Sequence, residues 1–207
     1  MATREGYSPS GRIPQRARGR ERREAVIDAA CAILTDAGEE ALTLHAAALR
    51  ANSSIGSMYH FFSDRDQLLR AVADRHRDAL TRLAAPSRRL TLDAWRNMDA
   101  AQVIDVLFRE PIDYFVAHPD ALIVHHLQDT GPARSFQSLL LRIMRARLGA
   151  AEGERVAATL YAVSTGTLAY LRGMRETLLP HDSIDIGGAL IAYLERIERG
   201  TRSEDAG

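Results

Sequence analysis

The chain lacks the features that mark membrane and secreted proteins. Among its 207 residues there is a single cysteine, Cys31, so no intrachain disulfide can form, and a reducing cytoplasm suits such a chain. No apolar run approaches the roughly 20 residues of a membrane span, and the polar, arginine-rich N-terminus is unlike a secretory signal. We therefore expect a cytoplasmic protein without a membrane partner, in which Cys31 is a small packing residue.

Sequence motifs of catalysis are missing as well. There is no HExxH sequence, no CxxC pair, no glycine-rich phosphate loop and no serine in a nucleophile elbow. The histidines and aspartates at 118–129 suggest a metal site, but the adjacent His125 and His126 would point about 100° apart on a helix and could not easily bind one ion together. The sequence predicts no enzyme activity, no metal site and no cofactor.

The chain also has no net charge and no lysine, so each of its 27 basic residues is arginine. The charge is unevenly spread, because residues 1–23 hold seven arginines against two glutamates, a local net charge of +5. DNA affinity depends on the face presented to phosphates rather than on the total charge. Residues 1–19, rich in Gly, Ser and Pro, are expected to form a disordered basic arm that either enters a minor groove or only raises nonspecific affinity.

Hydrophobic periodicity predicts helices and no strands along the rest of the chain. The first helix begins at Arg20 and ends at Gly38, and a later one, capped by Ser63 or Asp64, ends before Pro86. Further helices are expected from Leu92 to near Pro111, at 111–117, at 119–128, from the Thr130–Pro132 breaker to Gly149, at 152–174 and at 183–199.

Two short helices joined by a tight turn are predicted between the first helix and residue 62. Thr43 can cap a helix that ends near Arg50, and Ser54 can cap the next one. Between them lies Ala51-Asn52-Ser53, where Asn52 tolerates a left-handed backbone. This arrangement is a helix-turn-helix, whose second helix is suited to lie in a DNA major groove.

The residues of this segment resemble the N-terminal motif of the TetR family of bacterial transcriptional regulators. The matching positions, in order, are Thr43, Ala47-Ala48, Ala51-Asn52, Ser54, Gly56-Ser57-Met58-Tyr59, Phe61-Phe62, Arg65 and Leu68. Four of them depart from the family pattern: Ala47 replaces Ile, Asn52 replaces Gly, Phe61 replaces His and Arg65 replaces Lys. Phe61 cannot make the polar backbone contact that the histidine at this position often makes in family members. The similarity covers about residues 20–70, and the rest matches only in length and helical pattern.

The resemblance implies an all-α fold: an N-terminal three-helix helix-turn-helix DNA-binding domain plus a C-terminal helical ligand-binding and dimerisation domain. The expected divisions are 1–19, 20–66 and 67–207. It also implies roles on DNA. Side chains of the second helix would contact base edges, and hydroxyl groups and Arg65 would contact phosphates. His45 would contact either a base or a phosphate. Tyr59 could instead pack in the core. The implied DNA-binding residues are Thr43, His45, Ser54, Ile55, Gly56, Ser57, Tyr59, His60 and Arg65.

The last two helices carry small residues that would let two copies approach closely, although packing within one chain could also explain them. The resemblance favours a homodimer, with interface residues Ala158, Ala162, Gly166, Ala169, Gly187, Leu190, Ile191 and Leu194. Aromatic and Met side chains could line an apolar pocket for a small-molecule effector, although most would be core. These candidates are Trp95, Met98, Phe108, Tyr114, Phe115, Phe136, Met144, Tyr161 and Tyr170.

Taken together, these patterns predict a homodimeric regulator that binds a pseudopalindromic operator in double-stranded DNA. Repression, relieved by a small ligand, is implied by the resemblance alone. The alternative is a helical-bundle protein-interaction module without sequence-specific DNA binding. That alternative leaves the basic arm and the polar second helix unexplained.

Overall fold

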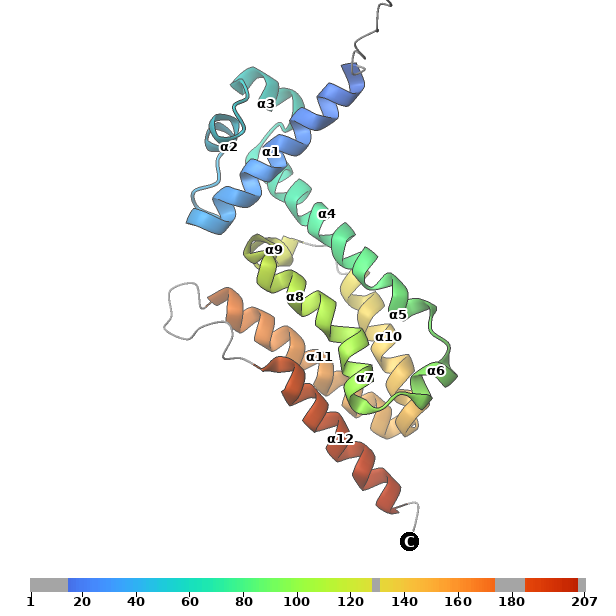
Figure 1. Ribbon diagram of the computed structural model, residues 1–207. Coiled ribbons are helices and arrows are strands. Elements are labelled where there is room, and N and C mark those ends of the chain that lie inside the picture. The colour runs from blue at the N-terminus through green and yellow to red at the C-terminus, as the bar shows by residue number, and fades with distance from the viewer. Residues whose placement is uncertain (1–14, 128–130, 174–184, 205–207) are drawn as a thin grey trace, which may run out of the picture.

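A computed structural model describes residues 15–127, 131–173 and 185–204, and these ranges contain helices and no strand (Figure 1). The all-α prediction is confirmed. A small group of helices at the N-terminal end is joined by the long helix α4 (Arg65–Leu83) to a larger helical bundle. None of the helices in the described ranges combines the length and the apolar character needed to cross a membrane.

The N-terminal group consists of α1 (Gln15–Ala37), α2 (Leu44–Arg50) and α3 (Ile55–Phe61). Its helix ends are defined by local signals. Gly38 takes a positive φ of 84° after α1, and Asn52 takes a φ of 49° in the turn between α2 and α3, as predicted. Asp64, rather than Ser63, caps α4 by accepting a hydrogen bond from the backbone N–H of Gln67 at 2.8 Å.

The larger bundle begins where α4 ends and contains the rest of the described chain. Its longest members, α10, α11 and α12, correspond to the three long helices expected after residue 130. The elements are α5 (Ala85–Arg89), α6 (Leu92–Asn97), α7 (Ala100–Ile104), a π-helical turn η1 (Asp105–Arg109), α8 (Glu110–Ala117), α9 (Pro119–Val124), a 3₁₀ turn η2 (His125–Leu127), α10 (Gly131–Leu148), α11 (Ala150–Gly173) and α12 (Ile186–Glu204).

Two sequence-based expectations about helix boundaries are wrong. The first helix starts at Gln15 rather than Arg20, so the last part of the supposed arm is helical; residues 1–14 lie outside the described ranges. The single helix expected between Leu92 and Pro111 is interrupted, because Asp99 starts α7 with a capping box. Pro111 does not end it, since the wider π turn just before this residue accommodates its missing N–H at the start of α8.

The buried side chains form two hydrophobic cores. The first contains residues of α1, α2, α3 and the first half of α4, from Leu68 to Ala73, together with Val124 of α9. The second fills the larger bundle, with Trp95, Leu140 and Leu160 among its fully buried side chains. Helix α4 therefore belongs to both halves, and α9 packs against both α1 and α4. A shift of α4 or α9 would therefore displace the helices of the N-terminal group that pack against them.

Candidate nucleic-acid interface

Helix α3 exposes one face and buries the other. Ile55 and Tyr59 are 42% and 60% exposed, and Gly56 and His60 are exposed beside them. Met58 and Phe62 point inward and belong to the first core. The exposed positions therefore recur at helical spacing on an outward face. Because Tyr59 lies on that face, its alternative role in core packing does not hold.

The polar residues at the helix starts are held by caps. Thr43 Oγ1 accepts the backbone N–H of Ala46 at 3.0 Å, and Ser54 Oγ accepts that of Ser57 at 3.2 Å. The Ser54 hydroxyl lies 3.0 Å from the Ser57 hydroxyl and donates to it. A Cβ added at Gly56 would meet no atom within 4 Å, so the backbone here is open to an approaching partner.

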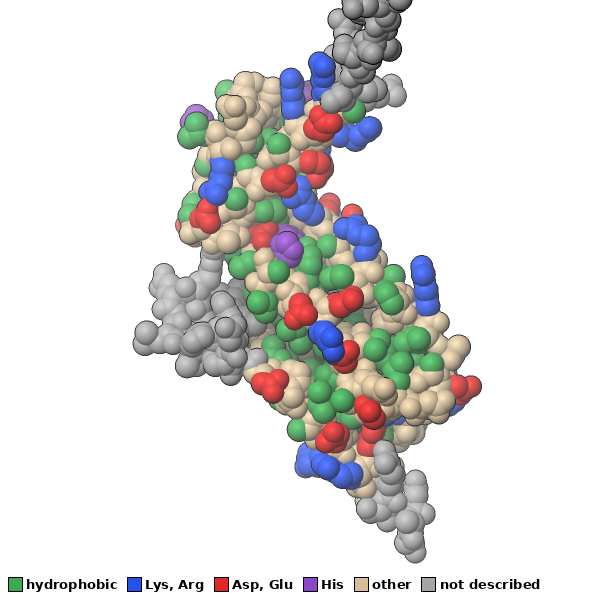
Figure 2. Space-filling view, in the orientation of Figure 1, with side chains coloured by type: hydrophobic (Ala, Val, Ile, Leu, Met, Phe, Trp, Pro, Cys, Tyr) green, Lys and Arg blue, Asp and Glu red, His purple; other side chains and the backbone are tan. Residues whose placement is uncertain are grey.

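A polar hollow of about 310 Å³ lies between α1 and the start of α3, lined by Arg22, Ala25, Ala51, Asn52, Ser53, Ser54 and Ser57. Ser57 is half-buried at its edge rather than on the outward face of α3. Figure 2 shows arginine side chains, in blue, gathered at the same end of α1. From the sequence alone, Arg22 contributes only to the positive charge of residues 1–23. Its position beside the start of α3 depends on how α1 packs against the helix-turn-helix, which no local spacing indicates.

Arg65, at the start of α4, is held by main-chain carbonyls of the loop between α1 and α2. Its Nε donates to the carbonyl of Leu42 at 2.9 Å, and its Nη2 donates to the carbonyl of Glu39 at 2.7 Å. A further Nη2 contact reaches the Glu39 carboxylate at 3.4 Å. The structure thus gives this residue a role in holding the start of α4 against the loop between α1 and α2. The phosphate contact of Arg65 stays a prediction, because 38% of its side chain is exposed beside these bonds.

In the larger bundle a cavity of about 620 Å³ lies between the α7–η1–α8 segment and the start of α12. It combines apolar walls with three aspartates and one arginine, and Arg109 is ion-paired to Asp105. Of the nine predicted ligand residues only Phe108 lines it, while Trp95, Phe115 and Met144 are buried core residues. The lining residues are Ala101, Gln102, Ile104, Asp105, Phe108, Arg109, Ile112, Asp113, Asp185, Ile186, Gly187 and Ile191.

The remaining predicted ligand residues are placed elsewhere. Met98, Phe136 and Tyr161 pack against the bundle core, and Tyr170 is exposed on α11. The Tyr114 hydroxyl lies 2.7 Å from Nδ1 of His76. Burial, reinforced by the charge of Asp120, raises the pKa of Tyr114, so the hydroxyl stays protonated.

The small-residue stripe of α11 faces solvent. Ala158, Ala162, Gly166 and Ala169 are exposed, and so are the neighbouring apolar side chains of Val163 and Tyr170. On α12, Gly187 and Ile191 are half-buried, whereas Leu190 and Leu194 are buried in the core of the same chain. The assignment of these two leucines to a dimer interface is therefore wrong, because their side chains are already covered.

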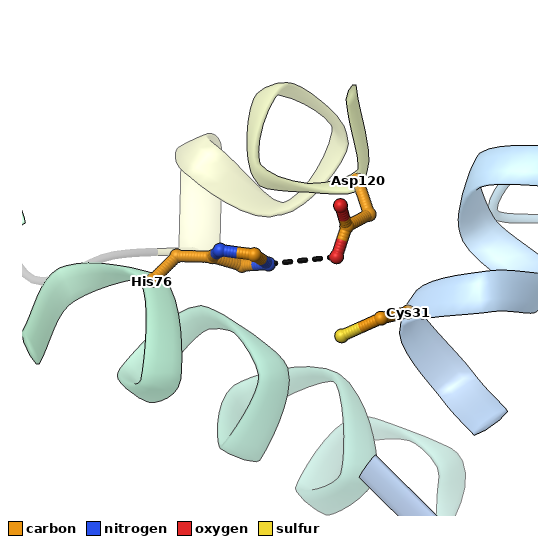
Figure 3. A group of neighbouring side chains, drawn as sticks. All are labelled: Cys31, His76 and Asp120. Carbon is orange, nitrogen blue, oxygen red and sulfur yellow. Dashed lines mark hydrogen bonds and ion pairs between the residues drawn. The ribbon is translucent and has the colours of Figure 1, made fainter. Parts of the chain in front are cut away.

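Three residues far apart in the sequence meet where α1, α4 and α9 pack together: Cys31, His76 and Asp120 (Figure 3). Burial and the neighbouring Asp120 raise the pKa of Cys31 to about 12, so its thiol is protonated. Burial alone would raise the pKa of Asp120, but hydrogen bonds from His76 and Cys31 outweigh this and lower it. Spacings of more than 40 residues leave no motif by which the sequence could indicate this cluster.

Comparison with known proteins agrees with this architecture. Residues 26–72 match the family described as bacterial regulatory proteins of the tetR family. The HTH-type transcriptional regulator BetI of Burkholderia ambifaria is 32% identical over 184 residues, which cover 80% of this chain and 93% of that protein.

Two solved structures share the fold. A TetR-like transcriptional regulator from Rhodococcus sp. RHA1 superposes with a TM-score of 0.60 at 17% identity, covering 90% of this chain and 96% of that one. The multidrug binding protein EbrR, complexed with malachite green, gives a TM-score of 0.57 at 20% identity, covering 86% and 98%. With these similarities and an outward-facing second helix in its helix-turn-helix, the chain belongs to the TetR family and is a DNA-binding transcriptional regulator, not an enzyme.

Proposed function

We propose that the protein is a homodimeric repressor that binds a pseudopalindromic operator through α3 and releases it when a small molecule occupies the bundle cavity. The observation that carries the DNA-binding part is the exposed face of α3, on which Ile55, Gly56, Tyr59 and His60 lie together. A dimer with two-fold symmetry presents two such helices to two half-sites of opposite orientation.

Base reading and backbone contact are assigned to different side chains. His60 can hydrogen-bond a base edge, and Ile55 can pack against a thymine methyl, because both project from the outward face of α3. Arg22, Ser54 and Ser57 surround the polar hollow beside that face and suit a phosphate. Tyr59 and the exposed Thr43 and His45 are further candidates for contact with the DNA backbone.

The first test is selection of genomic DNA fragments by the purified protein at moderate salt, followed by sequencing. Recovery of one pseudopalindrome would support the proposal. Recovery of random fragments at every salt concentration, from protein freed of small molecules, would refute sequence-specific binding and favour the protein-interaction alternative.

Substitutions then separate the two kinds of contact on the recovered site. His60→Ala should reduce discrimination against a changed base pair by about 1–3 kcal/mol. Arg22→Ala should weaken binding to all DNA sequences by a similar factor. It should also reduce the slope of log affinity against log salt concentration by about one. Arg88→Ala, which removes an exposed charge on α5 far from α3, is the matched control and should change neither quantity. A uniform loss from His60→Ala would contradict its role in base reading.

The cavity supports an effector that is largely apolar and carries a positive charge. Its volume of about 620 Å³ lies in the range of small-molecule sites, and its walls include Phe108, Ile112 and Ile191. Three aspartates against one arginine leave an excess of negative charge at the site. Helix α8, which forms one wall, packs against α4, whose first half supports α3. A ligand that displaces α8 can therefore change the position of the DNA-reading helix.

Dye binding tests the charge preference of the cavity. Malachite green, a cationic triarylmethane, is expected to bind and quench protein fluorescence, whereas phenol red, an anionic triarylmethane, should bind far more weakly. Asp113→Asn, which removes the charge of one cavity carboxylate, should weaken the binding of malachite green by about fivefold or more. Asp93→Asn, an exposed change on α6 outside the cavity, should leave binding unchanged. Equal affinity for the two dyes, or no effect of Asp113→Asn, would contradict the assignment.

A further inference from the structure

The cluster of Cys31, His76 and Asp120 has the composition of a metal site. The donor atoms, one sulfur, one imidazole nitrogen and one carboxylate oxygen, all lie within 4.8 Å of one another. Figure 3 shows the three side chains converging from α1, α4 and α9. His76 and Asp120 are only 2% and 4% exposed, so the centre of the cluster is shielded from bulk water.

The His76 ring is held so that one nitrogen faces the cluster. Its Nδ1 lies 2.7 Å from the Tyr114 hydroxyl, and its Nε2 lies 2.8 Å from Oδ2 of Asp120. A partner on the nitrogen that faces away from the ion is the usual outer-shell arrangement of a metal-binding histidine, because it fixes the tautomer and the ring orientation. Tyr114 can play this part with no change in its position.

We propose that Cys31, His76 and Asp120 form a binding site for a single Zn²⁺ ion at the junction of the DNA-binding and regulatory halves. Thiolate and imidazole favour Zn²⁺ over Mg²⁺ or Ca²⁺, which prefer oxygen ligands alone. With bonds of about 2.3 Å to sulfur and 2.0–2.2 Å to nitrogen and oxygen, tetrahedral ligand atoms lie roughly 3.3–3.6 Å apart. The side chains reach this spacing if Cys31 moves inward and the His76–Asp120 hydrogen bond opens slightly.

The charges of the site also balance. Binding replaces the thiol proton, which leaves to solvent as the sulfur–metal bond forms. The ring proton of His76 moves from Nε2, which binds the ion, to Nδ1, which donates it to the Tyr114 oxygen, and no electron is transferred. The thiolate and the carboxylate then neutralise the dication, and a water molecule can be the fourth ligand beside the three protein ligands. Arg75 lies nearby, with Nη1 3.9 Å from the Cys31 sulfur, but its charge is paired with Asp28 at 2.5 Å and Glu24 at 2.7 Å.

The ion would act as a link between the two halves. Two donors come from α1 and α4, which enclose the first core, and the third comes from α9, which follows the cavity-lining α8. Fixing these three helices to one ion would limit how far the DNA-reading helices can shift relative to the bundle. This inference does not depend on the proposed effector or operator, since the site exists in the chain regardless of either.

Co²⁺ is the probe for the experiment, with the tag-free, full-length protein stripped by a chelator. Because Cys31 is the chain's single cysteine, a thiolate-to-cobalt charge-transfer band in the near ultraviolet can arise from this residue alone. We expect one Co²⁺ per chain, this band together with visible absorption typical of four-coordinate cobalt, and loss of both on adding one equivalent of Zn²⁺. Zn²⁺ should also raise the thermal midpoint of unfolding.

Variants connect the signal to the three residues. Cys31→Ser should abolish the charge-transfer band, and Asp120→Asn should weaken binding by ~10-fold or more. Tyr114→Phe, which leaves all three ligands in place, should weaken it by roughly 10-fold through loss of ring orientation. His45→Gln, which removes an exposed histidine of α2, should bind cobalt as the unchanged protein does.

Circular dichroism of each metal-free variant reports whether it folds. If Cys31→Ser does not fold, Tyr114→Phe still tests the proposal, because it leaves the three ligands in place. The proposal is overturned if folded protein shows no charge-transfer band at millimolar Co²⁺. It is also overturned if Zn²⁺ leaves the thermal midpoint unchanged, in which case the cluster is a metal-free hydrogen-bonded contact between the halves.

Discussion

Arg147→Ala is expected to lower the free energy of unfolding by about 3–5 kcal/mol, because it removes one member of a buried ion pair together with the hydrogen bonds that its guanidinium donates. The side chains of Arg147 and Glu198 are only 6% and 10% exposed. The guanidinium of this arginine, on α10, donates to Glu198 on α12 through Nε at 2.9 Å. It also donates to the main-chain carbonyls of Trp95 and Met98, the latter at 2.8 Å. One side chain thus connects α10, α12 and the end of α6.

Urea denaturation followed by circular dichroism measures this loss. It is repeated at several protein concentrations, because the proposed dimer would also contribute to the apparent stability. Arg145→Ala is the matched control on the same helix. It removes an exposed ion pair with Glu154, and such pairs contribute about 1 kcal/mol or less. The double variant Arg147→Leu with Glu198→Leu should recover much of the stability, since a well-packed apolar pair can replace a buried ion pair. Equal losses from Arg147→Ala and Arg145→Ala would contradict a structural role for the buried pair.

Ala162→Glu is expected to reduce affinity for the full operator by about 100-fold or more while leaving the single chain folded. Ala162 lies in the exposed small-residue stripe of α11, so a glutamate there causes no clash within one chain. In the proposed dimer the two-fold axis brings this stripe close to its copy, and the added charges would be desolvated and would repel each other. Without the dimer, each half-site binds independently and the gain from simultaneous attachment disappears.

Analytical ultracentrifugation and operator binding, measured on the same samples, test this prediction. Ala162→Ser, which keeps the residue small, should remain dimeric. Ala117→Glu, which adds the same charge at an exposed position of α8, should also remain dimeric and bind the operator. A dimeric Ala162→Glu with unchanged affinity would exclude this part of α11 from the interface. The exposed Val163 and Tyr170 would then need another explanation.

Features determined by local chemistry could be predicted from the sequence. Thr43 and Ser54 cap helices because their side-chain oxygens reach backbone N–H groups three residues on, and Asn52 takes the left-handed turn that few other residues tolerate. At Pro111, periodicity and a breaker residue predict the end of a helix that the structure does not have. There the chain uses a π turn, which depends on how the segment packs as a whole.

The candidate site divides in the same way. The outward face of α3 follows from helical periodicity once the buried Met58 and Phe62 are recognised as core. The role of Arg65 could not be predicted from periodicity, because its partners are the main-chain carbonyls of Glu39 and Leu42, which carry no sequence signal. Nor does the effector cavity, where a single one of the nine candidate residues lies, since an aromatic or Met side chain fills a core as readily as it lines a pocket.

The sequence by itself determined the all-helical fold, the helix-turn-helix and the polar character of its second helix, because these depend on contacts between residues at most four positions apart. Only the tertiary structure decided which of those side chains remain exposed, where a cavity lies, and that Leu190 and Leu194 belong to the chain's own core. It alone brought Cys31, His76 and Asp120 together. The physical reason is that burial and the meeting of distant residues are properties of packed helices, which no local spacing encodes.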